Sequence, residues 1–296
     1  MNIALRDSDL PGFWRDADTA SLVGQMWALR YSRARLFGAL TAAFGGALTW
    51  TIDKADIAAM VIGLGFLIAL TSELATWVHQ PERDWYSGRA LAESARTLAW
   101  RYAVGADPFP AEMTESEARA ILRRRLDEVS AEARDRVTVT LEGAIVTSGM
   151  AKLRDLPFER RKDAYISGRT SQQHQWYARK AKANRKAATI WRFVLVMSEV
   201  VALVLAALRV FGGWTVDFAG LLGALIAAGA AWTALKQHTP LASAYSTAAT
   251  ELAIQADRLR DVSEADWAVA VADAEEAISR EHTLWLASRT GKKAVP

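Results

Sequence analysis

Cysteine is absent from this sequence of 296 residues, which excludes disulfide bonds, thiolate nucleophiles and cysteine-based metal sites. The sequence also lacks a glycine-rich phosphate loop, a metal-ligand cluster and a nucleophile with a base at a recognisable spacing. We therefore expect no enzymatic activity, no catalytic residues, no bound metal and no cofactor.

Two further absences narrow the class of protein. The formal net charge is only +3, so charge gives no reason to expect nucleic acid as a partner. The first 25 residues contain four aspartates and no apolar core, so we expect no cleavable signal peptide.

Charge is nearly absent from four long apolar stretches, although it is frequent between them. A bilayer core of about 30 Å is crossed by about 20 helical residues, and long basic side chains at the ends extend a shorter stretch. The alternative, a soluble protein with four buried core helices, is favoured by runs of only about 10–14 residues. We therefore predict an all-α integral membrane protein with four transmembrane helices. The stretches are Leu36–Ile52, Ile57–Val78 interrupted by Glu73, Phe193–Leu208 interrupted by Glu199, and Phe218–Leu235.

The connections within each pair of stretches are very short. Asp53–Asp56 joins the first two stretches, and Gly212–Trp214 joins the last two. Such loops predict two antiparallel hairpins, at about residues 36–78 and 193–235, each of which enters and leaves the membrane on the same side.

The distribution of arginine and lysine predicts which side that is. Residues 1–36 hold five, residues 79–189 hold 21 and residues 236–296 hold seven, whereas the two tight loops hold only Lys54. By the positive-inside rule, both termini and the middle region are cytoplasmic. Tryptophans near the ends of the stretches fit an interfacial aromatic belt; they are Trp50, Trp77, Trp191, Trp214 and Trp232.

A short pattern follows each predicted hairpin. His79, Pro81 and Tyr86 recur as His238, Pro240 and Tyr245 with identical spacing. We therefore predict two tandem modules, at residues 1–145 and 146–296, each with a helix, a hairpin and further helices. The two histidines are expected to cap a helix bend beside proline, and pH sensing is the alternative.

Helix signals also occur in the predicted cytoplasmic regions. A helix is expected from Asp84 to Val104, a capping box at Thr114–Glu117 opens another through Arg136, and Pro157 begins a long helix that continues into the third stretch. Ser263 opens a final helix, and we expect the tail from Gly291 to be disordered. The Arg123–Arg125 triplet is interpreted as a solvated face, with phosphate binding as the alternative.

Glu199 is the most informative polar residue of the apolar stretches. A carboxylate at that depth costs at least a few kcal/mol unless it faces protein or water. Because Arg192 lies two turns earlier on the same helical face, we predict that both line a cation-favouring pore, with a paired or neutral buried glutamate as the alternative. Glu73 is interpreted as an interfacial residue, and a gating role is less favoured.

Small residues recur at intervals of three or four along the fourth stretch. Such a seam lets helices approach closely, so we predict packing against the third stretch or against a neighbouring subunit. The predicted seam comprises Gly220, Gly223, Ala227 and Ala231, with Ala219 beside it.

Further motifs resemble a known family. Gln173-x-x-Trp176-Tyr177-x-x-Lys180-Ala181-x-x-Asn184 precedes the second hairpin, Glu251-Leu252 and Glu281-His282-x-x-Trp285 follow it, and Glu93–Tyr102 provides the matching segment of the first half. These motifs resemble the SLATT family of two-span bacterial membrane proteins, here in tandem.

The resemblance implies a pore-forming or membrane-perturbing effector of bacterial antiphage conflict systems. It implies location in the inner membrane, lipid as a partner and homo-oligomerisation. It further implies activation by a nucleotide second messenger or by a nucleotide-sensing protein. The alternatives are a regulated ion channel or transporter, and a scaffold that anchors a cytoplasmic partner. The family supplies no set of catalytic residues.

Overall fold

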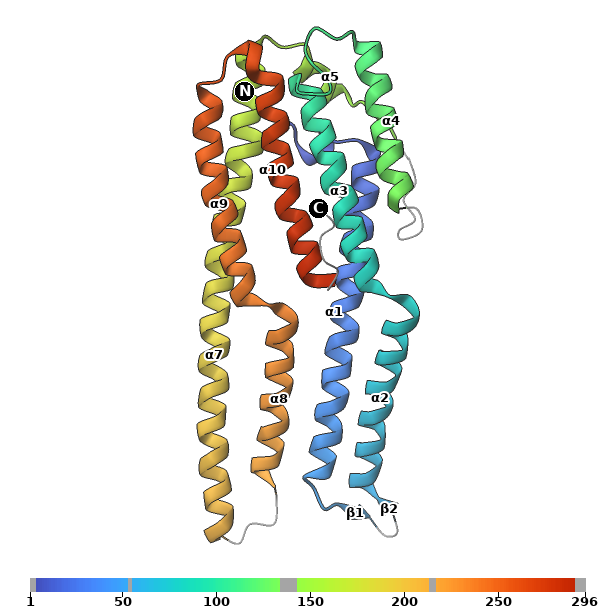
Figure 1. Ribbon diagram of the computed structural model, residues 1–296. Helices are drawn as coiled ribbons and strands as arrows, with labels where there is room; N and C mark the ends of the chain where they lie inside the picture. Colours follow the sequence, from blue (N-terminus) through green and yellow to red (C-terminus); the bar gives the residue numbers. More distant parts are fainter. Residues whose placement is uncertain (1–3, 53–54, 134–142, 213–216, 291–296) are drawn as a thin grey trace. The chain divides into compact units, whose positions relative to one another are not determined.

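The computed structural model describes residues 4–52, 55–133, 143–212 and 217–290, and side chains through Ile278 (Figure 1). This part of the chain is almost entirely helical. Its first half contains a 3-10 turn at Asp7–Asp9, α1 (Gly12–Gly46), β1 (Thr51–Ile52), β2 (Ala55–Asp56), α2 (Ile57–His79), α3 (Pro81–Val104) and α4 (Glu115–Ala133). Its second half contains α5 (Ser148–Arg154), α6 (Phe158–Tyr165), a π-helical segment at Ile166–Ser171, α7 (Gln172–Gly212), α8 (Phe218–Lys236), α9 (His238–Arg260) and α10 (Glu264–Thr290).

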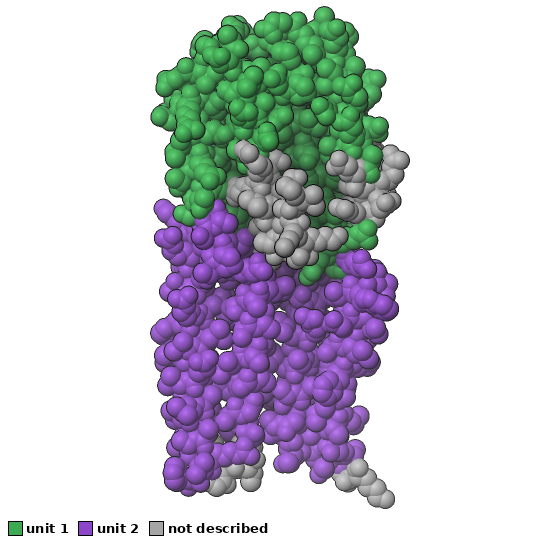
Figure 2. Space-filling view, in the orientation of Figure 1, with its two compact units in different colours: residues 1–25, 81–179, 245–296 green, residues 26–80, 180–244 purple. Residues whose placement is uncertain are grey.

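The chain divides into two compact units (Figure 2). The first, here called the core unit, comprises Met1–Gln25, Pro81–Arg179 and Tyr245–Pro296. The second, here called the apolar unit, comprises Met26–Gln80 and Lys180–Ala244. Each unit combines segments from both halves of the sequence.

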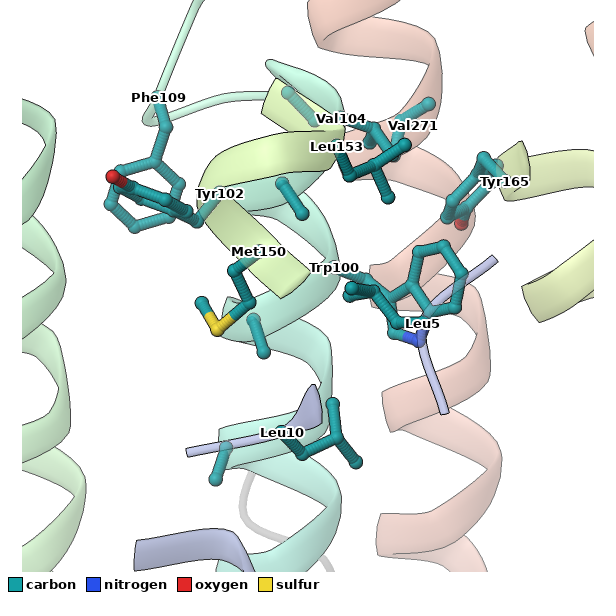
Figure 3. Close-up of a cluster of buried hydrophobic side chains, with 14 of the residues drawn as sticks. Leu5, Leu10, Trp100, Tyr102, Val104, Phe109, Met150, Leu153, Tyr165 and Val271 are labelled. Atoms are coloured by element: carbon teal, nitrogen blue, oxygen red, sulfur yellow. The ribbon is translucent and has the colours of Figure 1, made fainter. Parts of the chain in front are cut away.

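The core unit contains an extensive hydrophobic core around α3 (Figure 3). Ala95 and Ala99 are fully buried, and such small side chains allow neighbouring helices to approach α3 closely. Large side chains complete the packing, with Trp267 meeting Tyr165 edge to face at 5.8 Å between ring centroids. Helices α4, α5, α6 and α10 all contact α3, which is therefore the central helix of this unit.

The carboxyl end of α3 is closed by donors that lie far away in the sequence. The Val104 carbonyl accepts hydrogen bonds from Arg161 Nη1 at 3.1 Å and from Trp267 Nε1 at 2.9 Å. Arg154 Nη1 donates to the Tyr102 carbonyl at 2.9 Å. These groups satisfy the carbonyls that a helix end leaves unpaired, and the arginines complement its partial negative charge.

In the apolar unit, α1 and α2 lie antiparallel with their backbones in close contact. A Cβ atom on Gly38 would lie 2.6 Å from the Gly65 carbonyl oxygen, and one on Gly45 would lie 2.9 Å from the Ala58 carbonyl oxygen. Beyond the helices, β1 and β2 pair antiparallel, Thr51 with Asp56. Glycine is thus required along this contact, because any side chain there would force the helices apart.

The extent of the first predicted helix was wrong. Helix α1 ends at Gly46, so only Leu36–Gly46 of the stretch Leu36–Ile52 is helical, and Thr51–Ile52 forms β1. The consecutive glycines Gly45 and Gly46 disfavour helix, and the β-branched residues after them favour extended backbone. The connecting residues Asp53 and Lys54 lie outside the described residues, as do Gly213 and Trp214 of the second loop, residues 134–142 and the tail from Gly291.

Three helices in the described part of the chain are long and apolar enough to cross a membrane. They are Ile57–His79, the continuous helix Phe158–Gly212, and Phe218–Arg260, whose apolar part is α8. Large apolar side chains on these helices are exposed, including Phe66 at 63%, Leu203 at 72% and Phe211 at 89%. Exposed apolar surface of this extent belongs in lipid rather than in water, so the protein is a membrane protein.

The glycine contact between α1 and α2 gives a direct test. Replacing Gly65 by leucine is expected to destabilise the protein by about 3 kcal/mol or more, because the Cβ position already overlaps the backbone of Ala42. The matched control is Gly63→Leu on the same helix, where no atom lies within 4 Å of the Cβ position. Thermal unfolding in detergent should show a clearly lower midpoint for Gly65→Leu alone; equal midpoints would refute the contact.

Candidate functional site

Glu73, at the carboxyl end of α2, forms an ion pair. Its Oε2 atom lies 2.7 Å from Arg35 Nη1 of α1, and both side chains are more than half exposed. An opposite charge reduces the cost of a carboxylate at the edge of an apolar stretch. The sequence analysis missed Arg35, although the antiparallel register of the two stretches would place it opposite Glu73.

Glu199 and Arg192 both lie on exposed surface of α7. Within the part of the chain that the structure describes, neither forms an ion pair or a side-chain hydrogen bond. The glutamate is therefore not buried inside its own chain, and the alternative of a carboxylate paired within the bundle is not observed among the described residues. The unit as described does not bring Glu199 together with Glu73.

The predicted seam of α8 does not face α7. No atom lies within 4 Å of the Cβ position of Gly223, Ala227 and Ala231 are exposed, and Gly220 faces its own helix cap, Asp217. Packing of the seam against the third stretch, one of two predicted partners, is therefore wrong. Helix α8 meets α7 through Gly229 instead, whose Cβ position lies 3.1 Å from Leu195 and 3.6 Å from Trp191.

The two copies of the His-x-Pro pattern lie differently relative to the helix ends, one before and one after a break between helices. Gln80 and Gln237, both with positive φ, end α2 and α8. His79 is the last residue of α2, and its Nδ1 lies 2.9 Å from the Ala75 carbonyl oxygen. His238 is the first residue of α9, and its Nδ1 lies 2.9 Å from Asn184 Oδ1.

The remaining residues of the pattern are structural. Pro81 occupies the first position of α3, where its missing N–H leaves no bond unmade, and Pro240 lies in the first turn of α9. Tyr86 stacks on Trp85 with 4.9 Å between ring centroids. Tyr245 packs against Trp176 and Tyr177, each at 5.6 Å.

A buried polar cluster in the core unit, which the sequence analysis did not identify as a site, is centred on Arg169. Arg169 Nε donates to Glu275 Oε1 at 2.9 Å, and its Nη2 donates to Glu275 Oε2 at 2.8 Å and to Glu93 Oε1 at 3.0 Å. Tyr165 and Thr97 donate to the two Glu275 oxygens at 3.0 and 2.8 Å. The cluster joins α3, α10 and the continuous helix α6–α7, and Glu275 itself is fully buried.

The residue spacing of a regular α-helix does not predict this cluster, because Arg169 lies in the π-helical segment Ile166–Ser171. A π turn holds one residue more than an α turn, so it shifts the faces of the helix on either side of it. The sequence analysis had predicted a long helix from Pro157 into the third stretch, without this π-helical segment.

The environment of the cluster fixes its charge state. Burial alone would lower the pKa of Arg169, but the carboxylates of Glu275 and Glu93 outweigh it, so the pKa lies well above its ordinary value. Burial, followed by the Glu275 carboxylate, raises the pKa of Tyr165 well above 10.0. Tyr165 therefore remains a neutral donor and Arg169 a permanent cation throughout the physiological pH range.

A polar cavity of about 430 Å³ lies nearby in the core unit. Arg89, Arg96 and Arg179 line it together with Trp14 and Trp176, and so do the carboxylates Asp7, Asp18 and Glu93. Arg96 covers the Trp14 ring at 4.9 Å and pairs with Asp7 at 3.2 Å. Arg89 and Arg179 form no ion pair with any described residue, although carboxylates share the cavity with them.

The basic triplet of α4 is exposed, as interpreted from the sequence. Arg124 and Arg125 both approach Glu128, at 3.8 and 3.1 Å. Exposed pairs of this kind contribute little to stability. Among the described residues, no group of three histidine, aspartate or glutamate side chains is placed to hold a metal ion.

The buried cluster predicts a non-additive pair of substitutions. Arg169→Leu is expected to destabilise the protein by about 3–5 kcal/mol, because it leaves the Glu275 charge buried and uncompensated. Adding Glu275→Leu should recover at least half of that loss, because the uncompensated charge is then removed.

Chemical unfolding in detergent measures both effects, with Arg124→Leu on the exposed face of α4 as the control. A double variant that is as unstable as the two single losses added together would contradict the account.

Two family models match the chain in tandem. Residues 11–162 match SMODS and SLOG-associating 2TM effector domain 3, called SLATT_3, and residues 165–285 match SMODS and SLOG-associating 2TM effector domain 1, called SLATT_1. Comparison with curated proteins and with solved structures gives no match. The chain belongs to the SLATT family and carries two of its membrane effector domains in tandem.

Proposed function

We propose that the protein is an effector of a bacterial antiphage conflict system that crosses the inner membrane four times. The two helix pairs α1–α2 and α7–α8 are the hairpins, and the basic regions that flank them are cytoplasmic. The family description as a 2TM effector domain and the exposed apolar helices support this assignment. The two tandem modules act as one polypeptide.

The first crossing is short. Its helical part, Leu36–Gly46, rises about 16 Å, which is only about half of the bilayer core. The extended residues up to Ile52 add length, and pairing of β1 with β2 satisfies part of their backbone. Trp50, half exposed, is suited to the outer interface.

On activation, copies of the chain associate and permeabilise the membrane. The observation that carries this proposal is the outward-facing seam of α8, where the Cβ position of Gly223 has no neighbour within 4 Å. Small residues on a membrane helix allow a second helix to pack closely. Glu199, also exposed, is costly in lipid and is accommodated when an assembly surrounds it with water or protein.

Cross-linking tests the seam. Because the chain has no cysteine, Ala227→Cys introduces a single thiol beside Gly223. We expect activated protein in membranes to form cross-linked dimers through this thiol, and Gly223→Leu to reduce them several-fold by separating the helices. Gly63→Leu, on an open face of α2, is the control. Equal cross-linking in both variants would remove the seam from the interface.

Ion flux tests the pore. Liposomes that contain the activated protein should release cations, and Glu199→Gln should reduce the preference for cations because it removes the carboxylate. Glu251→Gln, an exposed position of α9 in the core unit, is the control. Flux and selectivity unchanged by Glu199→Gln would exclude Glu199 from the conduction path.

The same measurements separate the alternative functions. An effector conducts and arrests growth when it is induced in cells. A regulated channel or transporter conducts without arresting growth. A scaffold that anchors a cytoplasmic partner does neither.

The trigger in this proposal is a nucleotide second messenger, delivered directly or through a nucleotide-sensing protein. Three arginines of the core-unit cavity support direct binding, because guanidinium groups bind phosphate through paired hydrogen bonds, although three carboxylates line the same cavity. A cyclic dinucleotide that binds there should raise the unfolding midpoint by a few degrees, and Arg89→Gln should abolish the shift while Arg124→Gln preserves it. A shift that survives Arg89→Gln would place the ligand elsewhere.

A further inference from the structure

The two helix pairs of the apolar unit differ in how closely their helices approach. Gly38, Gly45 and Gly65 bring the backbones of α1 and α2 into contact. In the second pair, Trp191 and Leu195 of α7 face α8, where Gly229 receives them. Helices α7 and α8 therefore meet here through side chains rather than backbone against backbone.

A cavity of about 440 Å³ results between α7, α8 and the start of α9. Most of its lining is apolar and includes Trp191, Leu195 and Ala234. Its polar lining includes Arg192, Thr239 and His238, the last held by its contact with Asn184. The cavity therefore combines a hydrocarbon-like wall with one cationic and several hydrogen-bonding side chains.

Basic residues predominate around this cavity, and the nearest acidic residue of α7 is Glu199, one turn beyond Leu195. Residues 180–192 contain five arginines or lysines and no acidic residue, and Lys236 is the sole charged residue between positions 218 and 250. The first helix pair differs, since Glu73 pairs with Arg35 there. Arg192 has no such partner among the described residues.

We infer that this cavity binds one anionic phospholipid. An acyl chain lies along Trp191, Leu195 and Ala234, because an apolar cavity in a membrane is filled by hydrocarbon rather than by water. The headgroup phosphate accepts hydrogen bonds from Arg192 and Thr239, as basic pockets between membrane helices accept anionic headgroups. The inference rests on the proposed insertion of α7 and α8 into the bilayer, but not on permeabilisation.

The test uses the full chain purified in mild detergent and exposed to phosphatidylglycerol or phosphatidylcholine, with bound lipid counted by native mass spectrometry. Wild type should retain one phosphatidylglycerol in preference to phosphatidylcholine, and millimolar inorganic phosphate should not displace it. Arg192→Gln should weaken retention about tenfold through loss of a charge-assisted hydrogen bond. Ala234→Phe should abolish it by filling the cavity.

The matched control is Arg209→Gln, at the other end of α7, where Arg209 pairs with Asp217 at 2.6 Å. It should retain lipid as wild type does. The inference is overturned if wild type retains no phosphatidylglycerol, or if Arg192→Gln and Ala234→Phe retain as much as Arg209→Gln. Flotation of the same protein with liposomes reports insertion separately: a chain that floats without retaining the lipid refutes the lipid site alone, and a chain that does not float refutes insertion too.

Discussion

The requirement that exposed apolar side chains lie in lipid determines the interpretation of the whole apolar unit. In water, surfaces such as those of Leu203 and Phe211 would collapse or aggregate; in a bilayer they are solvated, and the helices satisfy their own backbone groups. Contacts between helices then depend on close packing rather than on hydrophobic burial. This environment explains the glycine contact between α1 and α2, the outward-facing seam of α8 and the ion pair of Glu73.

The two modules of the tandem have diverged in ways that the contacts make explicit. The first pair of helices is in close contact through glycines, and Glu73 pairs with Arg35. In the second pair, Trp191 and Leu195 contact Gly229, Arg192 has no acidic partner among the described residues, and small residues of α8 face outward. We therefore assign a structural role to the first pair and the interactions with lipid and other copies to the second. The core unit is held together differently, by a true hydrophobic core and the buried charges around Arg169.

Sequence reasoning succeeded where one segment determines its own structure. The stretches Ile57–Val78 and Phe218–Leu235 coincide with α2 and α8 to within a residue, α3 ends at Val104 as predicted, and Thr114 and Glu117 form the predicted capping box. It failed where the outcome depends on distant partners or on small differences in propensity. The end of α1 depends on two glycines, the direction of the α8 seam depends on which face meets Trp191, and the π turn at Arg169 accompanies pairing with Glu93 and Glu275.

The absence of native cysteine allows the central claim, that α2, α7 and α8 span a membrane, to be tested one residue at a time. Single cysteines at Asp127, Leu203 and Asp217 would be labelled in intact cells and in opened membranes with a membrane-impermeant maleimide. The account predicts that Asp217→Cys is labelled from outside, that Asp127→Cys is labelled only after the membrane is opened, and that Leu203→Cys is labelled in neither case. Rapid labelling of Leu203→Cys, or recovery of the unlabelled chain as a soluble protein without detergent, would contradict it.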